Sequence, residues 1–183
     1  MFTSPFAKEK AQAIQLKAKN HLIIASDQVA SCRNLTLGKP GNFTNTVNQL
    51  KQQPGQAVQF FTSVCVLDSA SSQMVTDIDI DIDIDIDIDI CTVHFRKLTE
   101  LQIINYVEKE KPYNCAGGFK SEALGIALFN KIKGDDPSAL IGLPLIKLIT
   151  LLSKFNVEVL YFSEIFYSLP STQTLAKIQF PTA

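Results

Sequence analysis

Seven consecutive Asp-Ile dipeptides, residues 77–90, constrain the fold of this chain more than any other segment. Their period of two matches the alternation of side chains along a β-strand, so the aspartates would lie on one face and the isoleucines on the other. As one strand the tract would reach about 46 Å, far beyond a usual strand, so we expect it to project or to break. Its exposed isoleucine face would be an aggregation liability, which the aspartates soften.

The tract has two interpretations. A carboxylate ladder could bind divalent cations, but aspartates about 7 Å apart on one face repel each other. Calcium-binding repeats also use glycine turns, and the tract contains no glycine. We therefore favour an expanded simple repeat that lengthens one strand.

The length and composition indicate one globular domain. The chain has 183 residues, of which 46% are hydrophobic, enough for a sizeable core. The best candidate for a membrane span, residues 139–152, is short and is interrupted by Pro144 and Lys147. We expect no membrane partner, no signal peptide and a cytoplasmic location.

The cysteines stand singly, and none belongs to a CxxC pair. With only two histidines in the chain they do not make a zinc-binding pattern. We expect reduced thiols that act as small buried apolar residues. They are Cys32, Cys65, Cys91 and Cys115.

The net charge of −1 conceals a basic body, because removing the seven aspartates of the tract leaves +6. A basic surface favours a polyphosphate ligand electrostatically. No arginine-rich face with interleaved aromatic residues is present, so we expect no nucleic-acid partner.

Helical and strand patterns alternate along the chain, which predicts an α/β fold with a mixed, twisted β-sheet flanked by helices. A hairpin is expected over residues 29–37, turning near Arg33-Asn34. The expected helices cover residues 5–19, 44–52, 99–111 and 143–155, with a capping box at Thr99 and Gln102 and a buried face of Leu101, Ile104 and Val107. The expected strands cover residues 21–25, 56–67, 93–95 and 124–132.

Three polar positions could carry chemistry. Asp27 follows the strand 21–25, and a carboxylate at a strand end can bind a metal or take a proton from water. Its alternative interpretation is a turn-forming residue. Lys39 could hold a phosphate or be a solvated turn lysine, and Lys10 lies off the apolar stripe of its helix, as a solvent-facing charge would.

Several short motifs together resemble one enzyme family. Glu9-Lys10-Ala11, Ser26-Asp27-Gln28-Val29, Gly38-Lys39-Pro40 and the segment 115–145, with Phe119-Lys120-Ser121-Glu122, resemble the Maf-like nucleoside triphosphate pyrophosphatases. Within that family the chain is most similar to the branch that acts on 7-methyl-GTP. The resemblance covers roughly residues 7–160, interrupted by the Asp-Ile tract.

The resemblance implies a role for each matching residue. It implies that Asp27 is the catalytic base and a ligand of Mg²⁺ or Mn²⁺, and that Lys10 and Lys39 contact the phosphates of a nucleotide substrate. Gln28 and Glu122 would read the base, since a glutamine stands at the latter position in the dTTP/UTP branch. A carboxylate there suits 7-methylguanine, which is cationic. The reaction would release a monophosphate and pyrophosphate.

The resemblance also implies that this chain differs from the family at both ends of the domain. We expect residues 1–160 to form the domain without the family's first strand and arginine-containing phosphate loop, and residues 161–183 to be an extension of unknown structure. Two alternatives stay open: a catalytically impaired nucleotide-binding remnant, and a structural module built on the Asp-Ile strand. A homodimer is also left open.

Overall fold

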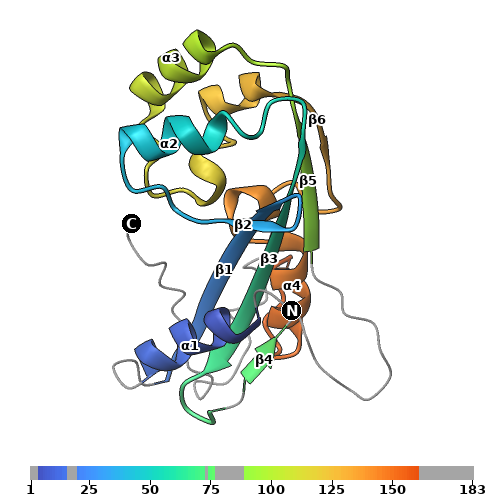
Figure 1. The fold of residues 1–183 in the computed structure, drawn as a ribbon. Helices are drawn as coiled ribbons and strands as arrows, with labels where there is room; N and C mark the ends of the chain where they lie inside the picture. The colour runs from blue at the N-terminus through green and yellow to red at the C-terminus, as the bar shows by residue number, and fades with distance from the viewer. Residues whose placement is uncertain (1–3, 16–19, 73, 77–88, 161–183) are drawn as a thin grey trace.

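The computed structural model describes residues 4–15, 20–72, 74–76 and 89–160 (Figure 1). These residues form a six-stranded sheet in the order β2-β1-β3-β5-β6, with β4 paired to β3. The strands are β1 (Leu22–Cys32), β2 (Leu35–Leu37), β3 (Ala57–Asp68), β4 (Met74–Thr76), β5 (Asp89–Phe95) and β6 (Phe129–Lys133). The α-helices are α1 (Ser4–Gln15), α2 (Phe43–Leu50), α3 (Glu100–Glu110) and α4 (Leu145–Ser153), and the 3₁₀ helices are η1 (Ala116–Gly118), η2 (Leu124–Leu128) and η3 (Ala139–Ile141).

The predicted α/β class, with a sheet flanked by helices, is confirmed. The described strand pairings are all antiparallel, so the sheet lacks the parallel pairs that alternating strands and helices suggested for a mixed sheet. Among the described residues, no helix combines the length and the apolar content needed to cross a membrane.

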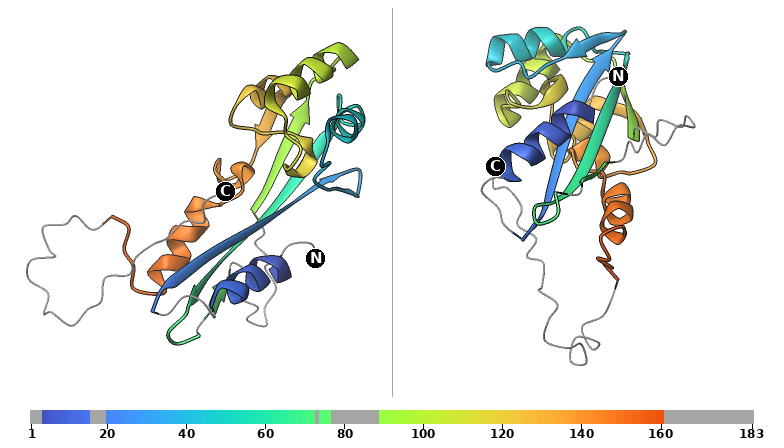
Figure 2. Two further views of the ribbon diagram at one scale, coloured as in Figure 1. Left: turned by 90° about the vertical axis from the view of Figure 1, so that its left-hand side faces the viewer. Right: turned by 90° about the horizontal axis from the view of Figure 1, so that it is seen from below.

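Helices cover both faces of the lower half of the sheet (Figures 1 and 2). On one face α1 packs Ala7 and Ala11 against a cluster that includes Cys65 of β3. On the other face α4 packs Leu148 and its neighbours against Val64, also of β3. Since side chains alternate along a strand, β3 supplies both clusters from adjacent residues.

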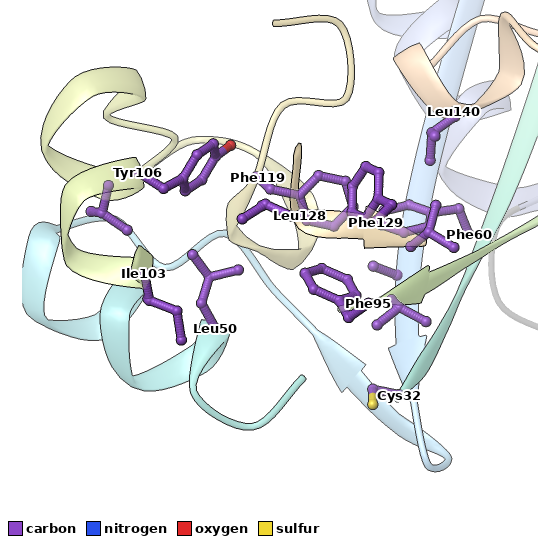
Figure 3. Packing of buried hydrophobic residues seen from close by; sticks show 14 of the residues in the cluster. Cys32, Leu50, Phe60, Phe95, Ile103, Tyr106, Phe119, Leu128, Phe129 and Leu140 are labelled. Atoms are coloured by element: carbon purple, nitrogen blue, oxygen red, sulfur yellow. The ribbon is translucent and has the colours of Figure 1, made fainter. Parts of the chain in front are cut away.

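The upper half of the sheet carries the largest core cluster, which α2 and α3 cover. Its centre is four phenylalanine rings in edge-to-face contact: the Phe119 ring centroid lies 5.3 Å from that of Phe60, 5.4 Å from Phe95 and 4.9 Å from Phe129 (Figure 3). Such aromatic pairs stabilise by about 0.5–1.5 kcal/mol each beyond the area they bury. They fix the loop before η2 to the sheet.

The first strand is longer than predicted. β1 continues from Leu22 to Cys32, and each of its residues has a partner on β3, including Asp27 opposite Ser63. The expectation that Asp27 follows a strand end is therefore wrong, because antiparallel pairing with β3 holds the polar residues in the strand. The turn at Arg33-Asn34 is confirmed, and both residues have the positive φ that a tight hairpin turn requires.

Two helices differ in detail from the prediction. α2 begins at Phe43, one residue before the expected start, because the Asn42 side chain caps it by accepting a hydrogen bond from the Asn45 N–H at 2.9 Å. The capping box before α3 is confirmed, but Leu101 is 66% exposed. Val107 is buried as expected, together with Ile103 and Tyr106, and Ile104 is partly buried against the same cluster.

The predicted strand 124–132 divides into η2 and β6. A 3₁₀ turn replaces its first part, and Gly125 there lies so near the Lys120 carbonyl oxygen that an added Cβ would stand 1.6 Å from it. Most of the Asp-Ile tract, residues 77–88, lies outside the described residues. Its last pair begins β5, where Asp89 is buried and Ile90 is 44% exposed, as a period of two predicts.

The segment between β6 and α4 is held by a buried carboxylate. Asp136 is 2% exposed and accepts hydrogen bonds from the Ser138 N–H at 2.8 Å, the Ser138 hydroxyl and the Ile146 N–H at 2.7 Å. Burial opposes ionisation, but these hydrogen bonds outweigh it and hold the Asp136 pKa below its ordinary value. Asp136 thereby caps α4, which has no capping side chain at Pro144.

Asp136→Asn should lower the free energy of unfolding at pH 7 by about 1.5–3 kcal/mol, the value of hydrogen bonds to a charged group. Because the folded-state pKa is depressed, the stabilisation is complete above the unfolded pKa and is lost as pH falls through the folded value. Urea titrations of the variant and the wild type from pH 7 to pH 3 should therefore converge at low pH. The exposed neighbour Asp135→Asn is the control, and an equal loss at both positions would contradict this account.

Candidate functional site

An open pocket of about 290 Å³ lies beside the middle of β1. Its walls come from α1, β1, the loop 114–122 and the segment 140–142. The residues that the sequence singled out as candidates all line it: Lys10, Asp27, Gln28, Lys39 and Glu122. Segments up to 132 residues apart in the chain, from Lys10 to Gly142, thus converge on one site.

Lys10 and Asp27 form the ionic centre of the pocket. The Lys10 Nζ lies 2.5 Å from Asp27 Oδ1 and donates a second hydrogen bond of 3.0 Å to the Ser26 carbonyl oxygen. The Lys10 side chain is 53% exposed and that of Asp27 is 19% exposed, so both stay accessible to a ligand. Lys10 is therefore not only a solvent-facing charge, because α1 directs its ammonium group to β1.

Gln28 holds in place the pocket wall that the segment 139–142 forms. Its Nε2 donates to Thr62 Oγ1 at 3.0 Å and to the carbonyl oxygens of Ala139 at 2.8 Å and Leu140 at 3.2 Å. Carbonyl oxygens only accept, so the amide orientation is fixed. The Oε1 of Gln28 is left available as an acceptor at the pocket.

The motif Gly38-Lys39-Pro40 lies at the mouth of the pocket, where Lys39 is exposed. Its backbone is tied down on both sides: Gln49 Nε2 donates to the Gly38 carbonyl oxygen at 3.1 Å, and the Gly41 N–H donates to the Tyr113 carbonyl oxygen at 2.8 Å. The turn is thereby fixed while the lysine side chain remains free to reach a ligand.

The Gly117-Gly118 turn joins the pocket-lining residues 114–116 to Phe119 and packs against the aromatic core. Both glycines have φ of +76°, and a Cβ at Gly117 would stand 3.2 Å from the Phe119 ring and 3.3 Å from the Phe60 ring. The buried Gln53 donates to the Gly117 carbonyl oxygen at 2.9 Å. Only glycine suits this conformation and this close approach.

Glu122 lies at the pocket rim and is exposed. Ser121 Oγ donates to its Oε2 at 3.3 Å, a long contact. Within the described residues, no group of three or more His, Cys, Asp or Glu side chains could hold a metal ion. Asp27 and Glu122 are the two carboxylates that line the pocket.

Sequence reasoning missed several residues that build the site. Two hydroxyl groups hold the segment 139–142. The Ser26 hydroxyl lies 2.6 Å from the Gly142 carbonyl oxygen, and the Thr62 hydroxyl donates to the Ala139 carbonyl oxygen at 3.0 Å. Phe60 and Leu140 add apolar wall to the pocket. No local sequence pattern marks these contacts, because each joins residues more than 70 positions apart.

Comparison with known proteins shows the family of the chain. A family model described as Maf-like protein matches residues 2–155. The chain belongs to the Maf-like family. It is 48% identical over 154 residues to the 7-methyl-GTP pyrophosphatase of Colwellia psychrerythraea, covering 84% of this chain and 72% of the relative. It is 45% identical over 154 residues to the protein of that name from Vibrio vulnificus, covering 84% and 74%.

The expectation of buried cysteines is met at three of the four positions in this Maf-like chain. All four are free, and Cys32, Cys65 and Cys91 are buried. Burial raises the pKa of Cys65 and of Cys91 to about 11, so both thiols are protonated at neutral pH. Cys115 lines the pocket and is partly exposed, and burial raises its pKa above that of an ordinary thiol, an effect that the nearby Lys120 partly offsets.

Cys115 should be the first thiol to react with an aromatic disulfide reagent at pH 8, and more slowly than a free thiol, because its pKa is raised. A nucleoside triphosphate with a methylene group between the α and β phosphates should slow this reaction by occupying the pocket. The Cys115→Ser variant should lose the first reactive phase. Reaction at an unchanged rate with the nucleotide bound would place the ligand elsewhere.

Proposed function

We propose that this protein hydrolyses 7-methyl-GTP, or a related modified nucleotide, between the α and β phosphates to give the monophosphate and pyrophosphate. The observation that carries the proposal is the convergence of Lys10, Asp27, Lys39 and Glu122 on one pocket. The names of the relatives support the choice of substrate.

The lysines supply the phosphate contacts in this proposal. Lys10 and Lys39 approach the pocket from different segments, and Lys120 also lines it. A triphosphate carries several negative charges, which ammonium groups bind as point charges. Stabilisation of the charge that develops on the leaving pyrophosphate would lower the barrier.

Asp27 acts as the general base. In the structure its Oδ1 is paired with the Lys10 Nζ. A phosphate oxygen entering the pocket competes for that ammonium group, which leaves the Asp27 carboxylate to take a proton from the attacking water. Phosphate binding and the activation of Asp27 as general base are then linked through Lys10.

The pocket fits a divalent cation that arrives with the nucleotide. Mg²⁺ is usually bound by one or two carboxylates together with substrate phosphates, and Asp27 is an accessible carboxylate beside the phosphate-binding lysines. Bound there, Mg²⁺ or Mn²⁺ would neutralise charge on the phosphates. The described residues supply no larger set of ligands.

Glu122 and Gln28 recognise the nucleobase of the substrate. Methylation at N7 gives guanine a positive charge, which a carboxylate at the pocket rim attracts. Gln28 can offer only its Oε1, because its Nε2 is engaged by the wall, so it would accept a hydrogen bond from an N–H of the base.

The proposal also covers the domain boundaries, the cellular location and the oligomeric state of the protein. We propose that residues 1–160 form the catalytic domain and residues 161–183 an extension. Free cysteines suit a reducing compartment, which favours the cytoplasm. The substrate is a small nucleotide, and a homodimer is compatible with this account.

Asp27→Asn keeps the shape of the side chain and removes the base, so pyrophosphate release from 7-methyl-GTP should fall at least ~100-fold. Circular dichroism and thermal melting should show an intact fold. The exposed Asp135→Asn is the matched control and should keep full turnover. Wild-type rates in Asp27→Asn would refute the assignment, and nucleotide binding without turnover in the wild type would indicate an impaired remnant.

Glu122→Gln should reduce the preference for 7-methyl-GTP over GTP by about 1–3 kcal/mol, the cost of losing a charge-assisted contact. The preference is measured as the ratio of kcat/KM for the two nucleotides. Glu108→Gln removes an equivalent exposed charge from α3, away from the pocket, and should leave the ratio unchanged. An unaltered ratio in Glu122→Gln would show that another group reads the methylated base.

A further inference from the structure

The loop that carries Glu122 is anchored at both ends to the last turn of α3. At its start the Lys120 N–H donates to the Tyr106 hydroxyl at 3.0 Å, and the Lys120 Nζ donates to the Glu110 carbonyl oxygen at 2.9 Å. At its end the Leu124 N–H donates to Glu110 Oε1 at 3.2 Å. Tyr106 and Glu110 are four residues apart and therefore share one face of the helix.

The two ends of the loop also contact each other. An added Cβ at Gly125 would stand 1.6 Å from the Lys120 carbonyl oxygen and 3.4 Å from the Tyr106 hydroxyl. Residues 120 and 125 therefore lie in direct contact, with Glu122 between them at the tip. Tyr106 is buried and reaches from α3 toward this closure (Figure 3).

Glu122 does little to fix its own position. Its side chain is exposed, and it accepts a long hydrogen bond of 3.3 Å from the hydroxyl of its neighbour Ser121. The position of the carboxylate is consequently set by the two ends of the loop. Electrostatic attraction weakens with distance, so a loose loop would hold the charge farther from a ligand for part of the time.

We propose that Tyr106 and Glu110 are positioning residues for nucleotide specificity: by holding both ends of the loop 120–125, they place Glu122 to distinguish a methylated, cationic purine from a neutral one. The proposal rests on the proposed function, because it assigns to α3 the control of the same site. Neither residue lines the pocket, so both act through Glu122 rather than on the nucleotide.

The test compares Tyr106→Phe with Tyr113→Phe, a matched loss of a hydroxyl from a tyrosine outside the pocket lining. Dissociation constants for 7-methyl-GMP and GMP are measured by calorimetry, and kcat/KM is measured for the two triphosphates. Tyr106→Phe should reduce the preference for the methylated nucleotide about three- to tenfold, the range of one hydrogen bond. Tyr113→Phe should leave it unchanged.

Glu110 provides a second variant in case Tyr106→Phe folds poorly. Glu110→Ala removes the acceptor for the Leu124 N–H and should reduce the preference, whereas Glu110→Gln keeps an Oε1 acceptor and should restore most of it. A purely structural role would change the melting temperature without this pattern in the specificity ratio.

The double variant Tyr106→Phe/Glu122→Gln separates action through Glu122 from any other effect. If Tyr106 acts through Glu122, its removal should have no further effect on the ratio once the carboxylate is gone. Equal effects of Tyr106→Phe in both backgrounds would overturn the inference. An unchanged ratio in Tyr106→Phe, together with a lower ratio in Glu122→Gln, would also overturn the inference. The proposed function would still stand in that case. A wild-type protein without preference for the methylated nucleotide would overturn both.

Discussion

The antiparallel pairing of β1 with β3 is the interaction on which the rest of the structure depends. It runs without a break from Leu22 opposite Asp68 to Cys32 opposite Val58. Because side chains alternate, this one register places Asp27 on the face covered by α1 and Gln28 on the face covered by the segment 139–142. A slip of one residue would exchange the two, separating the carboxylate from its lysine and the amide from the wall it holds.

The fold could be predicted from the sequence where the determinants are local. Thr99 and Gln102 supply a complete capping box, and the hairpin at Arg33-Asn34 follows from residue types that accept positive φ. Prediction failed where distant contacts decide. Asp27 continues a strand because β3 runs beside it, and the start of the strand expected from residue 124 becomes a 3₁₀ turn because Gly125 meets the Lys120 carbonyl oxygen. Neither partner can be read from the surrounding sequence.

The charged and amide side chains of the candidate site could be predicted from the sequence, but the residues that build its walls and its geometry could not. Family resemblance nominated Lys10, Asp27, Gln28, Lys39 and Glu122, and the structure brings these five residues to one pocket. No local pattern indicates that Lys10 binds the Asp27 carboxylate, or that the Gln28 amide nitrogen donates to backbone carbonyls. Tyr106 was not singled out from the sequence, because its hydroxyl meets Lys120 only after the chain returns to α3. Function therefore depends on contacts that local patterns do not encode.

The products formed from 7-methyl-GTP test the central claim most directly. Phosphorus NMR and anion-exchange chromatography of a reaction with Mg²⁺ should show 7-methyl-GMP and pyrophosphate in equal amounts from the first turnovers. Lys10 and Lys39 hold the phosphates beside the Asp27 carboxylate in this account, so water attacks where that carboxylate can take its proton. Release of inorganic phosphate with 7-methyl-GDP would show attack at the γ phosphate. That result, or the absence of any product, would contradict the account.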